Sequence, residues 1–153
     1  NGGDGNDIIF GDIGNDRMTG DKGNDIFIYQ KGDGEDIIFE KNPSENYQAN
    51  QQNNDILKFS DTNLLLNDNK TLSVVLSKIN NDLIIEFRNE NYLINTADKI
   101  TIIDQFATDS IQSRIDKVIN KIEFADNLAI DLAKISILEN DTSDKKLINF
   151  NYV

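Results

Sequence analysis

The sequence contains no cysteine and no histidine among its 153 residues. Without cysteine, the chain forms neither disulfides nor thiolate metal sites. Without histidine, it lacks the usual zinc ligand and the base of a Ser-His nucleophile. Its 27 acidic residues leave carboxylate pairs for acid–base chemistry, but their spacing singles out no catalytic couple. We therefore expect this segment not to be an enzyme.

Basic residues are also scarce, so that the net charge is −12. An acidic surface repels nucleic acid and anionic lipid, and divalent cations are its natural counter-charge. An acidic shell kept for solubility is the alternative explanation. The charge is uneven, however: residues 1–36 hold nine acidic and three basic side chains, and all nine glycines lie within residues 2–34. The opening segment is therefore a different kind of structure from the rest.

Three nine-residue units follow one another at the start of the chain. They are GGDGNDIIF at 2–10 (unit 1), GDIGNDRMT at 11–19 (unit 2) and GDKGNDIFI at 20–28 (unit 3). Each unit is a glycine and carboxylate turn followed by a tripeptide with an apolar centre. A fourth, KGDGEDIIF at 31–39 (unit 4), begins two residues late and has lysine in place of the leading glycine. We number the places in each unit from one to nine.

The turns have the composition of a calcium site. Glycines at places one, two and four allow positive φ and leave the backbone carbonyls uncovered. Asp7, Asp16 and Asp25 add a carboxylate at place six. Calcium takes about six to eight oxygen ligands, so a second loop stacked on the first must supply the rest. The alternative is that these clusters are ordinary turns of a hairpin meander, but three copies in phase favour calcium.

The tripeptides alternate as short strands do, which predicts that Ile9, Met18 and Phe27 point inward. Two units make one turn of a coil, so units 1 and 3 stack on one flank and units 2 and 4 on the other. Ile8 then stacks over Ile26 and Phe10 over Ile28. We expect this outer apolar face to be covered by the 55–140 module or by a partner, and we expect the other sheet to present Arg17 and Thr19 to solvent.

These units resemble the GGxGxDxUx repeats of the RTX group, the haemolysin-type calcium-binding repeats of type I secreted toxins, proteases and lipases. The resemblance implies a parallel β-roll over residues 1–40, with each ion held by carbonyls and place-six carboxylates of two stacked loops. One site would use Gly3, Gly5 and Asp7 with Gly20, Lys22 and Asp25, where Lys22 supplies only its carbonyl. A second, less regular site would use Asp12, Gly14 and Asp16 with Lys31, Asp33 and Asp36.

Residues 41–54 are polar and contain the single proline, which predicts an exposed loop. Residues 55–153 read as a β-rich capping module, with strands expected at 55–59, 72–79, 83–88, 92–96, 99–103 and 121–125. A short amphipathic helix is expected around 111–119, and one strand running into another over 128–138. Asn91 and Asn127 are candidate left-handed turn residues.

Four stretches of this second region resemble the haemolysin-type calcium-binding related domain that often follows RTX repeats. They are NDILKF (54–59), NNDLIIEF (80–87), DKITIIDQF (98–106) and NKIEFADN (120–127). The resemblance implies a mostly β module that caps the open end of the roll. The whole chain is thus expected to be all-β, a parallel β-roll followed by a β capping module with one or two short helices.

The resemblance implies a calcium-binding module of a secreted, extracellular bacterial protein, first of all a toxin, which folds on binding calcium after type I export. The expected partners are calcium ions, upstream repeats of the same parent chain and the type I secretion machinery. Membrane or host-cell contact would come only through the parent protein. A surface adhesin and the tail of a secreted protease or lipase remain as alternatives. Because the chain begins inside a repeat, we expect it to belong to a longer array.

Overall fold

The computed structural model describes residues 1–39, 54–68, 71–106, 118–137 and 145–149. These residues form an all-β fold, as predicted, and the helix among them is the single-turn 3-10 helix η2 (Leu132–Lys134). None of the described helices is long and apolar enough to cross a membrane. The expected helix around 111–119 and the expected loop 41–54 fall almost wholly outside the described residues.

The four units wind between two sheets, which confirms the predicted roll. Strand β2 (Ile8–Phe10) pairs in parallel with β5 (Ile26–Tyr29), placing Ile8 beside Ile26 and Phe10 beside Ile28. In the other sheet, β3 (Arg17–Met18) pairs in parallel with β6 (Glu35–Ile38). At the turns, β1 (Gly3–Asp4) pairs with β4 (Asp21–Lys22). Units 1 and 3 therefore share one flank, and units 2 and 4 the other.

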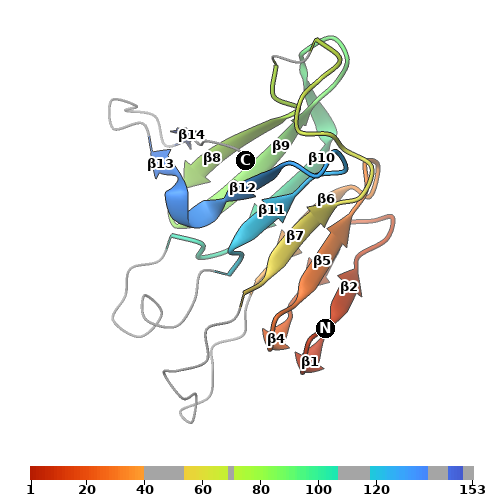
Figure 1. Cartoon of the computed structure of the whole chain (residues 1–153), viewed down its shortest axis with the longest axis vertical. Coiled ribbons are helices and arrows are strands. Elements are labelled where there is room, and N and C mark those ends of the chain that lie inside the picture. Colours follow the sequence, from red (N-terminus) through yellow and green to blue (C-terminus); the bar gives the residue numbers. More distant parts are fainter. Residues whose placement is uncertain (40–53, 69–70, 107–117, 138–144, 150–153) are drawn as a thin grey trace.

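Strands from the second region extend both sheets of the roll. Strand β7 (Ile56–Phe59) pairs in parallel with β5, and β11 (Lys121–Glu123) pairs in parallel with β7. On the other side, β10 (Ile94–Ile102) pairs in parallel with β6. The five-stranded sheet therefore runs from β2, near the N-terminus, through β5, β7 and β11 to β12 (Ala129–Asp131) (Figure 1).

The remaining strands complete the seven-stranded sheet with antiparallel pairs. Strands β8 (Val74–Ile79), β9 (Asp82–Arg88) and β10 form a meander. Beyond β8 lie β14 (Lys145–Asn149) and β13 (Ser136–Ile137). The expected strands at 92–96 and 99–103 are one strand, β10, whose register with β9 shifts between Asn95 and Lys99. A bulge, rather than a turn, separates the two apolar runs.

The hydrophobic core receives side chains from both sheets. Ile9, Met18 and Phe27 are 7%, 3% and 0% exposed, which confirms their predicted inward direction. Towards the second region the core becomes aromatic. Tyr29 stacks on Phe87 with ring centroids 5.3 Å apart, and Phe59 meets Phe87 edge-on at 5.2 Å. Such contacts between rings stabilise by about 0.5–1.5 kcal/mol beyond the area that they bury. The roll and the second region thus share one core.

Two surface predictions were wrong in part. The described part of the 55–140 module does not cover the outer face, where Ile8 is 64% and Phe10 59% exposed; coverage by a partner stays a prediction. The reason is that β7 and β11 join the edge of the sheet by hydrogen bonding and do not pack on its outer face. In the other sheet Arg17 is exposed, as predicted, but Thr19 is only 4% exposed. Unit 1 lies against Thr19, whose carbonyl accepts the Gly2 N–H at 2.9 Å.

Turn residues were predicted with partial success. Asn127 has φ of 64°, as expected, but near residue 91 the left-handed residue is Tyr92, with φ of 64°. The Asn89 side chain explains the difference, since its Oδ1 accepts the N–H groups of Asn91 and Leu93 at 2.9 and 3.1 Å. This Asx turn fixes the chain before Tyr92, so the positive φ moves one residue along.

Candidate metal centre

The place-six aspartates of stacked units are joined by hydrogen bonds. The Asp7 N–H donates to Asp25 Oδ1 at 2.8 Å, and the Asp16 N–H donates to Asp36 Oδ1 at 2.9 Å. The same contact recurs once more, because the Asp25 N–H donates to Oδ1 of the buried Asp55 at 2.8 Å. The carboxylates of one flank therefore form a column through successive coils, as the nine-residue period predicts.

Place five forms a second column, which the sequence analysis missed. The Asn24 N–H donates to Asn6 Oδ1 at 2.9 Å, and the Asn54 N–H donates to Asn24 Oδ1 at 2.8 Å. Asn54 and Asp55 therefore continue the repeat pattern beyond unit 4. The signal was present in the sequence, where Asn54-Asp55-Ile56-Leu57 repeats the order asparagine, aspartate, any residue, apolar residue of places five to eight.

The glycines of the loops have two different roles. Places two and four have positive φ in all four units, including Asp12 at 62° and Asp21 at 67°. Place one does not have positive φ, contrary to our expectation; there glycine leaves room for the carboxylate. A Cβ at Gly2 would lie 2.7 Å from Asp7 Oδ2 and 2.8 Å from the Gly20 carbonyl oxygen, and one at Gly20 would overlap Asp25 Oδ2. Oxygens of two stacked loops therefore meet beside Gly2.

Asp25 and Asp36 each use one carboxylate oxygen, Oδ1, to accept an N–H group of the stacked unit. Oδ2 of Asp7, Asp25 and Asp36 is buried and has no hydrogen-bond partner. Burial raises the pKa of the Asp25 carboxyl, and the neighbouring Asp7 carboxylate raises it as well. Burial likewise raises the pKa of Asp36 to about 6. Buried carboxylate oxygens without partners are unfavourable unless a cation compensates them, so these atoms fit a bound metal ion.

The structure brings together all six residues predicted for the first site. The Gly3 N–H donates to the Gly20 carbonyl at 3.0 Å and the Gly5 N–H to the Lys22 carbonyl at 2.8 Å, in addition to the bond between Asp7 and Asp25. Each carbonyl oxygen keeps a second lone pair for another donor or a metal. The Lys22 ammonium lies outside, paired with the exposed Asp4 carboxylate at 3.3 Å, so Lys22 offers only its carbonyl here.

The second predicted site is assembled in part. Unit 2 meets unit 4 through the Gly14 N–H and the Asp33 carbonyl at 2.7 Å, and through Asp16 and Asp36. Oδ2 of Asp36 and Oδ2 of Asp16 lie 3.1 and 3.5 Å from the point where a Cβ on Gly11 would sit. Among the described residues, no backbone hydrogen bond joins the third pair, Asp12 and Lys31.

Acidic side chains alone do not outline either site. Within the described ranges, no three acidic side chains gather where they could hold a metal ion. This agrees with the chemistry of the loops, because each predicted site has two place-six carboxylates and draws its other oxygens from the backbone. Such hard oxygen donors suit Ca²⁺. The residues present therefore fit a calcium ion between stacked coils.

Comparison with protein families agrees with this geometry. Residues 1–27 match the family described as RTX calcium-binding nonapeptide repeat (4 copies). The chain carries RTX repeats. Residues 82–134 match the haemolysin-type calcium binding protein related domain. The RTX match ends before unit 4, and the second match begins at residue 82. Unit 4 and the stretch 54–59 therefore lie outside both matches.

RTX repeats bind Ca²⁺, and Ca²⁺ is the cofactor of this RTX module. A search of curated proteins finds none that matches the chain. A calcium ion bound between the stacked loops would place positive charge beside the buried carboxylate oxygens. The residues that would hold it are those of the two predicted sites, with the first more completely assembled.

Proposed function

We propose that this RTX module is a calcium-controlled folding segment of a secreted bacterial exoprotein, in the first instance a toxin. The observation that carries the proposal is the set of buried, unpartnered Oδ2 atoms of Asp7, Asp25 and Asp36 on stacked loops. They make the coiled state of units 1 to 4 dependent on a cation. We infer no enzymatic activity for this segment, which would act by binding calcium.

The physical basis is a balance between chain entropy and ion binding. Ordering the backbone costs about 1–2 kcal/mol per residue, and the short strands β1 to β4 bury only Ile9 and Met18 among their apolar side chains. Calcium that binds only the folded coil stabilises it in proportion to RT ln(1 + [L]/Kd). External calcium modules have a Kd of about 10⁻⁴–10⁻³ M. Repeats with such an affinity stay uncoiled in the cytosol and fold outside.

This dependence suits export through a type I secretion system, which would carry the chain unfolded. The expected location of the parent protein is therefore extracellular. Both statements rest on the RTX repeats, and further repeats of the same parent chain would stack on the exposed edge strand β2. The −12 net charge also supports the proposal, because it opposes compaction of the chain until cations bind.

Isothermal titration of the chain with CaCl₂ tests the proposal. We expect two bound ions with a Kd of about 10⁻⁴–10⁻³ M, and a gain of β-sheet signal in far-UV circular dichroism over the same concentration range. A titration in MgCl₂ is the matched control, because Mg²⁺ demands a tighter octahedral shell and keeps its waters. Absence of calcium binding, or a spectrum unchanged by calcium, would contradict the proposal.

One observation favours a second candidate, a repeat segment of a surface adhesin. Ile8 and Phe10 are exposed on the outer face of the five-stranded sheet, beside the partly buried Ile26 and Ile28. An apolar surface of this kind is typical of a contact region. In an adhesin, calcium would stiffen the segment. The calcium titration does not separate the two candidates, but binding of the folded module to host-cell surfaces, abolished by Phe10→Ser, would support the adhesin.

A further inference from the structure

The loop of unit 4 lacks the neighbour that completes the loop of unit 1. In unit 1, the N–H groups at places one and two bond to backbone carbonyls of the next coil. Gly2 donates to Thr19 at 2.9 Å and Gly3 donates to Gly20 at 3.0 Å. No repeat follows unit 4 on its own flank, so the same two N–H groups, on Lys31 and Gly32, need other acceptors.

Side-chain carboxylates of the second region take the place of those missing carbonyls. The Lys31 N–H donates to both oxygens of Asp61 at 3.1 Å, and the Gly32 N–H donates to Asp98 Oδ1 at 3.0 Å. Asp61 lies two residues after the end of β7, and Asp98 lies in β10. Two residues far apart in the sequence thus complete the loop as a further repeat would.

Asp98 is held firmly for this contact. It is 3% exposed, its Oδ2 accepts from Asn95 Nδ2 at 2.6 Å, and its Oδ1 also accepts from the Tyr29 hydroxyl at 3.3 Å. The bulge in β10 lies between Asn95 and Lys99. Bulges re-aim side chains, and this one directs a carboxylate at the unit 4 loop. By comparison, Asp61 is exposed.

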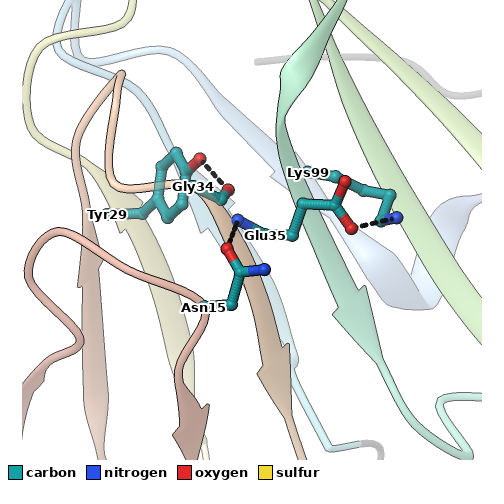
Figure 2. Close-up of polar contacts among 5 residues, drawn as sticks. All are labelled: Asn15, Tyr29, Gly34, Glu35 and Lys99. Atoms are coloured by element: carbon teal, nitrogen blue, oxygen red, sulfur yellow. Dashed lines mark hydrogen bonds and ion pairs between the residues drawn. The ribbon is translucent and has the colours of Figure 1, made fainter.

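The same loop is also tied at places four and five (Figure 2). The Tyr29 hydroxyl donates to the Gly34 carbonyl at 2.8 Å. The backbone N–H of Lys99 donates to the same carbonyl at 3.0 Å. Toward unit 2, the Glu35 N–H donates to Asn15 Oδ1 at 3.1 Å. The loop therefore lies between two supports, with the second region on one side and unit 2 on the other.

We propose that Asp98 is a positioning residue for the second calcium site, standing in for the repeat that unit 4 lacks. By fixing Gly32, it places the adjoining Asp33 carbonyl toward the Gly14 N–H, 2.7 Å away, and Asp36 toward Asp16. Outer-shell partners of this kind change metal affinity by about 10–100-fold when removed. The inference rests on the proposed function, since it assumes that the second site binds calcium.

The two calcium sites are therefore held in place by different parts of the chain. The first site is assembled from loops of units 1 and 3, and the hydrogen bonds of Asp98 among the described residues go to Tyr29, Gly32 and Asn95 instead. The second site is linked to the packing of β10. Because coupling between two events is reciprocal, calcium in the second site should also strengthen the contact between unit 4 and β10.

Calcium titration of the Asp98→Asn variant of the full chain tests this inference. Asparagine keeps the shape of the side chain and removes the charge that strengthens the bond to Gly32. We expect the second site to weaken by about 10–100-fold and the first site to change by less than about twofold. Glu90→Gln, on the exposed β9–β10 turn, makes the same change in net charge and should leave both sites unaltered.

Amide resonances assign each binding event to its site. The Gly5 N–H reports on the first site and the Gly14 N–H on the second, since each bonds to a carbonyl of its stacked loop. In the Asp98→Asn variant, only the Gly14 resonance should respond at higher calcium than in the native chain. If both resonances shift equally, or neither does, the inference is overturned. If the native chain binds no calcium, the proposed function itself fails.

Tyr29→Phe provides a second variant, because it keeps the ring that stacks on Phe87 and removes the hydroxyl that joins Asp98 to Gly34. We expect a smaller loss at the second site, about two- to tenfold, and none at the first. Hydrogen exchange of the Lys99 amide adds a readout of the reciprocal effect. Calcium should protect this amide in the native chain and less in either variant, and equal protection in all three would overturn the inference.

Discussion

Units 1 and 4 have nearly the same sequence but are completed in different ways. The unit 1 loop lies on another glycine-rich loop, and its N–H groups bond to backbone carbonyls of Thr19, at the end of unit 2, and of Gly20 and Lys22 in unit 3. The unit 4 loop instead bonds to the side chains of the buried Asp98 and Tyr29 and of the exposed Asp61. A calcium-binding coil therefore needs a neighbour on each side, and this neighbour is either another coil or a set of well-placed side chains.

The difference predicts where calcium matters most. Unit 1 contributes Ile9 alone to the core, whereas unit 4 is joined to β10 through both backbone and side chains. Removal of calcium should therefore affect the two ends of the roll unequally.

Chelation of calcium should have the largest effect. We expect EGTA to abolish the hydrogen-exchange protection of units 1 and 2, while β8 and β9, paired with each other over six residue pairs, keep theirs. The reason is that the roll loses the cation that compensates its buried carboxylates. Amide exchange followed by NMR in calcium and in EGTA measures this. Uniform loss of protection along the chain would show that the roll and the second region fold as one unit.

Substitution of a glycine where two coils touch should have the next largest effect. A Cβ on Gly23 would overlap the Gly5 carbonyl oxygen, whereas a Cβ on Gly5 meets no atom within 4 Å. Both glycines have positive φ, at 139° and 122°, so the strain on the backbone is similar. We expect Gly23→Ala to lower the free energy of unfolding by about 1–3 kcal/mol more than Gly5→Ala.

Urea unfolding in saturating calcium provides the comparison for these two variants. Each alanine at a positive φ costs about 1–3 kcal/mol. The difference between the two free energies of unfolding cancels this shared cost and leaves the effect of the contact between coils. Equal destabilisation by the two substitutions would mean that units 1 and 3 do not stack as closely as the structure shows.

The roll is the part that could be predicted from the sequence. A strict period of nine fixes both the alternation between sheets and the pairs Ile8–Ile26 and Phe10–Ile28. The carboxylate columns follow from the same period. The continuation of the repeat pattern at Asn54 and Asp55 was harder to find. Fifteen residues (39 to 53) separate it from Ile38 of unit 4, and no leading glycine marks it.

The completion of unit 4 could not be predicted in the same way. Asp98 reaches Gly32 only because β10 pairs with β6, a contact between residues 66 positions apart. Nothing in the local pattern N-T-A-D-K distinguishes a bulge from a turn, and for this reason β10 was expected as two strands. Likewise, the sequence does not show whether β7 pairs with the edge of the sheet or packs on its outer face. Because β7 pairs with the edge, Ile8 and Phe10 stay exposed.

Asp25→Asn should have a moderate effect that is confined to the first site. Oδ1 of Asp25 accepts the Asp7 N–H, and Oδ2 is the buried atom without a partner. Asparagine preserves an acceptor and removes the charge, so we expect at least a tenfold rise in Kd, equivalent to about 1.4 kcal/mol. Asp7→Asn should weaken the same site.

Asp4→Asn is the matched control for charge, because Asp4 is 82% exposed and its ion pair among the described residues is with Lys22. We expect this change to leave the Kd nearly unaltered, since exposed ion pairs contribute about 0–1 kcal/mol. Calcium titration of the three variants measures the ranking. A loss in Asp4→Asn as large as in Asp25→Asn would indicate that overall charge, rather than a defined site, governs binding.

Removal of the ion pair between Lys99 and Glu35 should have the smallest effect. Lys99 Nζ lies 2.6 Å from Glu35 Oε2 and joins β10 to unit 4 (Figure 2), but the two side chains are 36% and 43% exposed. A double-mutant cycle with Lys99→Met and Glu35→Gln should give a coupling free energy below about 1 kcal/mol, which decreases further in about 1 M salt. A larger coupling that persists in salt would contradict the present view of this contact. It would mean that unit 4 is joined to β10 mainly by this surface pair, and that the buried hydrogen bonds of Asp98 and Tyr29 are secondary.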